Sequence, residues 1–132
     1  MLLFLSEWTK IKTLHSIGAD IHYLNDDAFK TSCLYGKFDV AQWLYSIGVD
    51  IHANKQIAFE WACYSGSLDL AKWLYSFGGI DIHANNEKPF KDACAYGTSN
   101  LDLVKWLYSI GARINDDHYK INKNILIKLL NK

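Results

Sequence analysis

WLYSIGVDIH, at residues 43–52, returns along the chain as WLYSFGGIDIH at 73–83 and, with fewer identities, as WLYSIGARIN at 106–115. A weaker copy, LHSIGADIH, stands at 14–22. One cysteine and one phenylalanine recur at spacings of 30 and 31 residues: Cys33, Cys63 and Cys94, and Phe29, Phe59 and Phe90. Periods of this size are typical of stacked supersecondary units. The chain is therefore predicted to be a repeat protein.

The segment before a recurring glycine predicts a first helix in each unit. In the second unit its apolar residues follow the i, i+3, i+4 spacing of an amphipathic helix: Phe59, Ala62 and Cys63. Glycine adopts a left-handed conformation at little cost and commonly ends helices. The first helices are therefore predicted to end at Gly36, Gly66 and Gly97.

A second helix is predicted after each of these turns. Its apolar positions in the second unit are Leu70, Ala71, Leu74 and Phe77, and Gly78 is predicted to stop it. Residues 50–58 have neither helical spacing nor alternation, so we expect an extended connecting loop there. Because one helix pair cannot bury its own apolar face, neighbouring pairs must stack. The predicted fold class is an all-α solenoid of helix-turn-helix units.

The predicted organisation is a single domain over residues 1–132. An N-terminal capping unit is expected at 1–24, full repeats at 25–54, 55–85 and 86–117, and a C-terminal capping helix at 118–132. Both ends are interpreted as caps because they keep only part of the repeat's apolar pattern.

Composition and charge exclude several function classes. Lys and Arg together number 14, as do Asp and Glu, so the chain lacks the basic surface typical of nucleic-acid binding. No apolar run approaches the roughly 18 residues of a membrane span, and residues 1–5 are too short for a signal peptide. No glycine-rich phosphate loop occurs. We expect an intracellular protein without cofactor, nucleic acid or membrane partner, monomeric or weakly self-associating.

Two strings in the chain resemble ankyrin repeats. Residues 48–53, GVDIHA, are similar to the family's Gly-Ala-Asp-Val-Asn-Ala, and residues 58–63, AFEWAC, to its Thr-Pro-Leu-His-x-Ala-Ala. The chain departs from the family pattern in three ways: the proline survives only as Pro89, the histidine is Lys30, Glu60 or Lys91, and the loop glycine is absent. The resemblance implies stacked helix pairs that bind a protein partner and have no enzymatic activity.

The repeat is about three residues shorter than the usual ankyrin unit of 33 residues. Its short loop and its Trp-Leu-Tyr-Ser string resemble the divergent ankyrin proteins of giant DNA viruses. This narrower resemblance implies a viral protein that acts on host proteins in the cytoplasm or nucleus of the infected cell.

Recurring polar residues follow the repeat in parallel rows: His22, His52 and His83; Cys33, Cys63 and Cys94; Asp20, Asp50 and Asp81. A metal site or a catalytic centre needs its ligands or carboxylates gathered at one point. We therefore predict no metal and no active site. The cysteines are predicted to be buried thiols, the aspartates to make cap or loop hydrogen bonds, and the histidine rings to bond the loop backbone.

Aromatic side chains on the second helices are predicted to pack in the core: Trp43, Trp73, Trp106, Tyr45, Tyr75 and Tyr108. The ends of the first helices and the loop tips instead vary between units, which suggests recognition of a partner protein. The candidate partner-binding residues are Leu34, Tyr35, Trp61, Tyr64, Ser65 and Tyr96 on first helices and Lys55, Gln56, Glu87 and Lys88 at loop tips. A packing role for these residues, a self-associating structural protein, and an enzyme or metal-binding protein remain alternatives.

Overall fold

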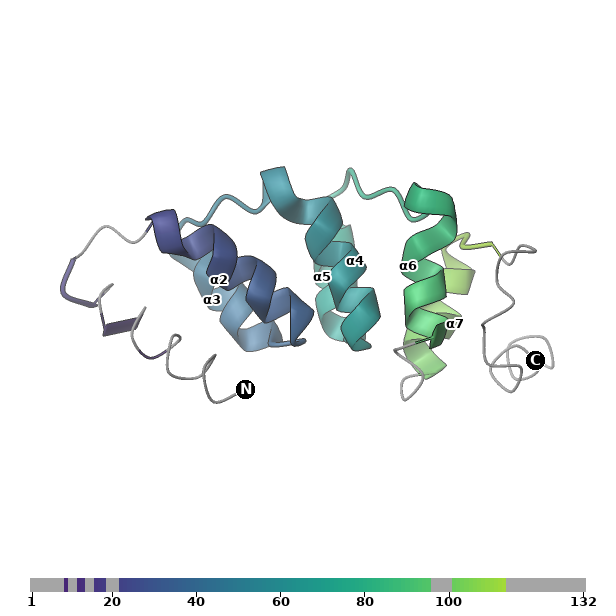
Figure 1. The fold of residues 1–132 in the computed structure, drawn as a ribbon, viewed down its shortest axis with the longest axis horizontal. Helices are drawn as coiled ribbons and strands as arrows, with labels where there is room; N and C mark the ends of the chain where they lie inside the picture. Colours follow the sequence, from purple (N-terminus) through teal and green to yellow (C-terminus); the bar gives the residue numbers. More distant parts are fainter. Residues whose placement is uncertain (1–8, 10–11, 14–15, 19–21, 96–100, 114–132) are drawn as a thin grey trace.

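The computed structural model describes residues 9, 12–13, 16–18, 22–95 and 101–113. Three antiparallel helix pairs stand side by side (Figure 1). They are α2 (His22–Leu34) with α3 (Phe38–Ser46), α4 (Lys55–Ser65) with α5 (Leu68–Ser76), and α6 (Ala84–Ala95) with α7 (Leu101–Ser109). The described part contains no strand. The first helices α2, α4 and α6 form one layer and the second helices form the other, which confirms the predicted solenoid.

Glycine closes the turn between the two helices of a pair. Gly36 has φ 68° and Gly66 φ 78°, both left-handed, as the sequence predicted. The next residue then folds back: the Lys37 N–H donates to Ser32 O at 2.7 Å and the Ser67 N–H to Ala62 O at 3.0 Å. These bonds satisfy carbonyl groups that every helix end otherwise leaves unpaired. Gly97 lies outside the described residues.

The repeated Trp-Leu-Tyr-Ser-x-Gly string closes the second helix. The Ser46 hydroxyl donates to Trp43 O and the Ser109 hydroxyl to Trp106 O, each at 2.6 Å. The following glycine takes a left-handed conformation, with φ 100° at Gly48. Serine thus pairs a carbonyl of the last turn, and glycine redirects the chain toward the next unit.

The core is built from the same set of buried side chains, which recurs in each unit along the stack. Buried positions that recur in each unit are the phenylalanines Phe29, Phe59 and Phe90, the cysteines Cys33, Cys63 and Cys94, and the leucines Leu44, Leu74 and Leu107. Helix α4 packs against α2 on one side and α6 on the other. The predicted burial of the three thiols is confirmed, and all three are free.

The aromatic residues of the second helices connect neighbouring units. The tryptophans are partly buried against the core, as predicted. The tyrosines are more exposed than predicted, and Tyr45 and Tyr75 each lie edge-on against the tryptophan of the following unit. The ring centroids are 5.7 Å apart for Tyr45 and Trp73 and 5.5 Å apart for Tyr75 and Trp106.

The segment between units is shorter than predicted. Residues 50–58 do not form an extended loop: a 3₁₀ turn, His52–Asn54, leads directly into α4 at Lys55. No glycine or proline interrupts residues 51–58, so nothing prevents the helix from starting early. The carboxylate of Asp50 accepts the His52 N–H at 2.9 Å, and Asp81 accepts the His83 N–H at the same distance. The predicted loop hydrogen bonds of these aspartates are confirmed.

Candidate functional site

The ends of the first helices expose tyrosine. Tyr35, at the end of α2, is 51% exposed, and Tyr64, near the end of α4, is 42% exposed. Leu34 beside Tyr35 is half-buried. Both tyrosines belong to the layer that α2, α4 and α6 form together (Figure 1). The described candidates on this layer therefore include two large amphipathic side chains that solvent reaches.

Helix α4 adds an apolar stripe to the same layer. Ile57 is 43% exposed and Trp61 is partly buried against the core. Ile57, Trp61 and Tyr64 are spaced i, i+4 and i+7, so they lie on one face of the helix. Ile57 was not among the sequence candidates because residues 50–58 were predicted to form a loop. Its helical spacing from Trp61 was the signal that could have identified it.

Ser65 and Gln56 tie units together and are less available for a partner. The Ser65 hydroxyl donates to Ala62 O at 3.0 Å and lies 3.4 Å from Cys33 O in the preceding unit. The Gln56 amide bonds both peptide groups of Asp81, its Nε2 donating to the carbonyl and its Oε1 accepting the N–H, each at 2.9 Å. Both candidates are half-buried, and their side chains hydrogen-bond to the backbone of a neighbouring repeat. Lys55, also half-buried, begins α4 beside Gln56.

The loop tip of the third unit differs from that of the second. Asn85, Asn86 and Glu87 have φ values of 55°, 58° and 65°, so three successive residues other than glycine are left-handed. Such a residue costs about 1–2 kcal/mol, although asparagine tolerates the conformation better than most. Lys88 and then Pro89 follow these three residues. Lys88 is exposed and its Nζ donates to Asp92 Oδ2 at 2.6 Å.

Glu87 was predicted to be a binding residue at the loop tip, but it is only 5% exposed. Its Oε1 lies 2.5 Å from His83 Nδ1, and its Oε2 is buried without a hydrogen-bond partner among the described residues. The predicted bond from the His83 ring to the loop backbone is therefore wrong. The Glu87 carboxylate, four residues after His83, binds the His83 ring in place of a backbone carbonyl. A charge-assisted hydrogen bond is stronger than one to a neutral carbonyl.

A further contact holds the same loop against α4. Asn85 Nδ2 donates to Glu60 Oε1 at 3.1 Å across the two units. Tyr96, the remaining candidate, lies outside the described residues.

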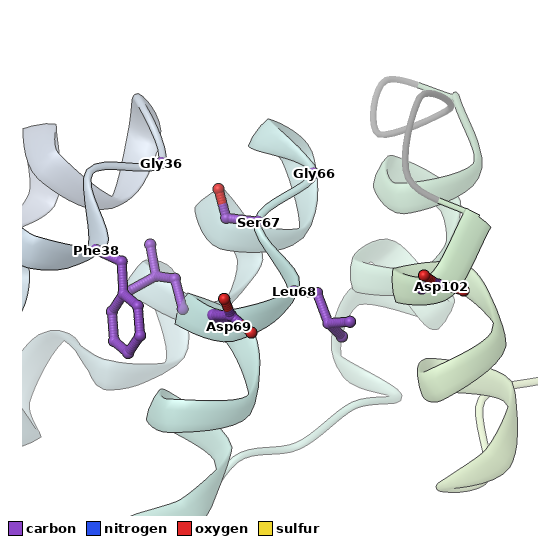
Figure 2. Close-up of a pocket in the computed structure, with 8 residues that line it drawn as sticks. Gly36, Phe38, Gly66, Ser67, Leu68, Asp69 and Asp102 are labelled. Atoms are coloured by element: carbon purple, nitrogen blue, oxygen red, sulfur yellow. The ribbon is translucent and has the colours of Figure 1, made fainter.

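An open pocket lies at the turns between paired helices (Figure 2). Its lining is formed by two glycines and a serine, three apolar residues and two carboxylates: Gly36, Gly66 and Ser67; Phe38, Leu68 and Leu70; Asp69 and Asp102. Figure 2 shows Asp69 between Phe38 and Leu68, with Asp102 on a separate helix. Each aspartate is in the first turn of its helix, where a negative charge is favoured by the helix dipole. This lining contains no cysteine, histidine or lysine.

Within the described residues, no group of three or more His, Cys, Asp or Glu side chains is arranged to hold a metal ion. Among the helices described, none has both the length and the apolar character needed to cross a bilayer.

Burial keeps the thiols protonated. It raises the pKa of Cys33 and of Cys94 from 9.0 to about 12. Burial raises the pKa of Cys63 still further, with the nearby negative charges of Asp92 and Glu60 adding to the effect. Thiolate is the reactive form of cysteine, so these thiols lack the microenvironment of a catalytic nucleophile.

We expect the three thiols of the folded protein to react with a thiol reagent at pH 8 at least about a thousandfold more slowly than free cysteine, because their thiolate fraction is that much lower. In urea all three should react at the rate of free cysteine. Stopped-flow labelling measures the rates. One thiol reacting equally fast in both states would contradict this assignment.

The raised pKa values also make the stability of the fold depend on pH. Unfolded thiols ionise near pH 9 and the folded Cys33 and Cys94 near pH 12. The stability that these two thiols contribute is therefore full below pH 9 and is lost between pH 9 and pH 12.

Three stacked helix pairs with a repeated core and a layer of variable exposed side chains define an α-solenoid. A family model for ankyrin repeats, in three copies, matches residues 29–118. The chain belongs to the ankyrin repeat family, whose members are generally protein–protein interaction modules without enzymatic activity. No curated protein and no solved structure matches the chain significantly.

Proposed function

We propose that this ankyrin repeat protein binds a partner protein through its layer of first helices. The observation that carries the proposal is the exposure of Tyr35 and Tyr64 at the ends of successive first helices. Tyrosine presents a rigid amphipathic surface at small entropic cost, and interfaces and their hot spots are enriched in it. Neither side chain is needed to fill the repeated core.

The proposed surface is centred on Tyr35, Ile57 and Tyr64, with Leu34 and Trp61 as its partly buried floor. Lys88, which is exposed, and Lys55 supply polar contacts at its edge. Tyr96 remains part of the proposal by its equivalence to Tyr35 in the repeat. Glu87 is excluded because it is buried, and Ser65 and Gln56 support the surface from within the stack.

Only the resemblance to giant-virus ankyrin proteins indicates what kind of partner the chain binds. The short repeat is similar to those of giant-virus ankyrin proteins, which supports a viral protein that binds a host protein in the cytoplasm or nucleus. One observation favours self-association as a second candidate: the second helices carry their own row of exposed tyrosines, Tyr45, Tyr75 and Tyr108. That row lies on the opposite layer from the proposed surface.

The double variant Tyr35→Ala, Tyr64→Ala should lower partner binding at least about thirtyfold, because truncation of a hot-spot residue costs about 2 kcal/mol or more. Tyr108→Ala is the matched control, since Tyr108 is 43% exposed but lies on a second helix. Quantitative pull-downs from host-cell lysate identify a partner, and titration calorimetry with that partner gives the affinities.

Equal affinities of the double variant and the wild type would contradict the proposed surface. Light scattering tests the second candidate. A wild type that dimerises and a Tyr108→Ala variant that stays monomeric would move the interface to the second helices.

A further inference from the structure

The same tetrapeptide, Ile-His-Ala-Asn, follows two different courses in this chain. At residues 51–54 it enters the 3₁₀ turn that precedes α4, where Asn54 has φ −118° and Lys55 φ −60°. At residues 82–85 it enters the left-handed turn, where Asn85 has φ 55° and Asn86 φ 58°. The tetrapeptide itself therefore does not select the conformation.

The four residues after the tetrapeptide differ between the units, Lys-Gln-Ile-Ala at 55–58 and Asn-Glu-Lys-Pro at 86–89, and the proline has the largest effect on the backbone. Ala58 is the fourth residue of α4, and Pro89 holds the equivalent place in the third unit. Proline there has no N–H for the helical hydrogen bond, and its ring clashes with the carbonyl four residues earlier. A right-handed course like that of residues 53–57 is thus penalised in the third unit.

The left-handed course carries costs of its own. Three residues other than glycine are held in an unfavourable backbone conformation. Glu87 is buried with Oε2 unpaired among the described residues, so part of its charge loses solvation without compensation. Three side-chain bonds offset these costs: His83 with Glu87, Asn85 with Glu60, and Lys88 with Asp92. Both courses are therefore strained.

We propose that residues 84–88 form a two-state switch at the edge of the partner-binding surface. In the state described here the turn is left-handed and Glu87 is buried against His83. In the other state the segment takes the right-handed course of residues 53–57. The bonds of Asn85 to Glu60 and of Glu87 to His83 break, and Glu87 moves to the half-buried place that Gln56 holds in the second unit, where solvent reaches it. The loop tip then gains a negative charge beside Lys88.

A partner that contacts this loop tip binds one state better than the other, so the equilibrium between the states sets its apparent affinity. This consequence rests on the proposed function. The switch itself is a property of the free chain and is tested without any partner, so its failure and that of the proposed function are distinguishable.

Nuclear magnetic resonance of the isotope-labelled wild type and of Pro89→Ala tests the switch. In the wild type, residues 85–87 should give the strong intraresidue amide-to-α-proton contacts of left-handed residues, together with microsecond-to-millisecond exchange confined to residues 84–88. In Pro89→Ala the right-handed form should become the major one, so these strong contacts should disappear. The matched control, Asn86→Gly, relieves left-handed strain while it keeps the bond between Asn85 and Glu60, so it should suppress the exchange.

Two results would overturn the proposal. One is a wild type whose relaxation-dispersion and saturation-transfer profiles are flat at residues 84–88. The other is a folded Pro89→Ala variant, verified by its tryptophan fluorescence, that keeps left-handed contacts at all three residues.

Discussion

Replacing Phe59 by alanine is expected to lower the free energy of unfolding by about 3–5 kcal/mol, the usual cost of truncating a fully buried phenylalanine. The Phe59 ring is completely buried. It belongs to α4, the helix that packs against both α2 and α6, and it lies 6.3 Å from the rings of Tyr75 and Trp106. The cavity would therefore weaken the internal packing of the middle unit and its contacts with the third unit.

Urea titration followed by tryptophan fluorescence measures this effect. Ile57→Ala is the matched control, because Ile57 is on the same helix but 43% exposed, and it should cost well under about 1 kcal/mol. Solenoid stability is the sum of unit and interface contributions, so Phe59→Ala should also broaden the transition. Equal losses in the two variants would show that α4 does not hold the stack together through this face.

The second large effect is expected for Trp73→Ala, with a loss of about 3 kcal/mol, the lower end of the range because Trp73 is only partly buried. Its ring packs against four aromatic side chains. The centroid distances are 6.5 Å to Phe29, 5.7 Å to Phe38, 5.7 Å to Tyr45 and 5.1 Å to Phe77. The first three partners belong to the preceding unit, so the tryptophan joins two repeats.

A double-mutant cycle isolates this connection. Tyr45→Ala and Trp73→Ala together should show a coupling energy of about 0.5–1.5 kcal/mol, the range for edge-to-face aromatic pairs. Tyr45→Phe is the control and should keep the coupling, because the ring remains. Strictly additive losses would mean that the contact between Tyr45 and Trp73 adds nothing beyond separate burial.

Much of the fold could be predicted from local periodicity. The glycines at 36 and 66 mark left-handed helix ends because other residues pay a steric cost in that conformation. The spacing of Phe59, Ala62 and Cys63 marks a buried helical stripe, which all three residues confirm. The start of α4 was placed too late, although Ile57 lies at helical spacing from Trp61 and residues 55–58 are mostly good helix formers. Residues 118–132, predicted to form a capping helix, lie outside the described part, and α2 already begins at His22, inside the predicted N-terminal cap.

The candidate site was less predictable because most of its side chains act across units. Variation at the helix ends correctly marked Tyr35 and Tyr64 as positions outside the repeated core. Nothing in the sequence separates Ser65 or Gln56 from a free surface residue, since each bonds a backbone group 32 or 25 residues away. The burial of Glu87 likewise depends on the left-handed turn at residues 85–87, and the preceding tetrapeptide, Ile-His-Ala-Asn at 82–85, does not determine that conformation.

The repeat by itself determined that the chain stacks helix pairs, that its three thiols are buried at equivalent positions, and that glycine ends the helices at 36 and 66. These properties depend on local sterics and on apolar spacing, which every unit carries in its own residues. Tertiary structure alone decided which variable side chains face solvent, which tie neighbouring units together, and which course the loop before α6 takes. Those outcomes depend on small differences between burial, strain and hydrogen bonding to the adjacent unit, and the differences exist only once the units are stacked.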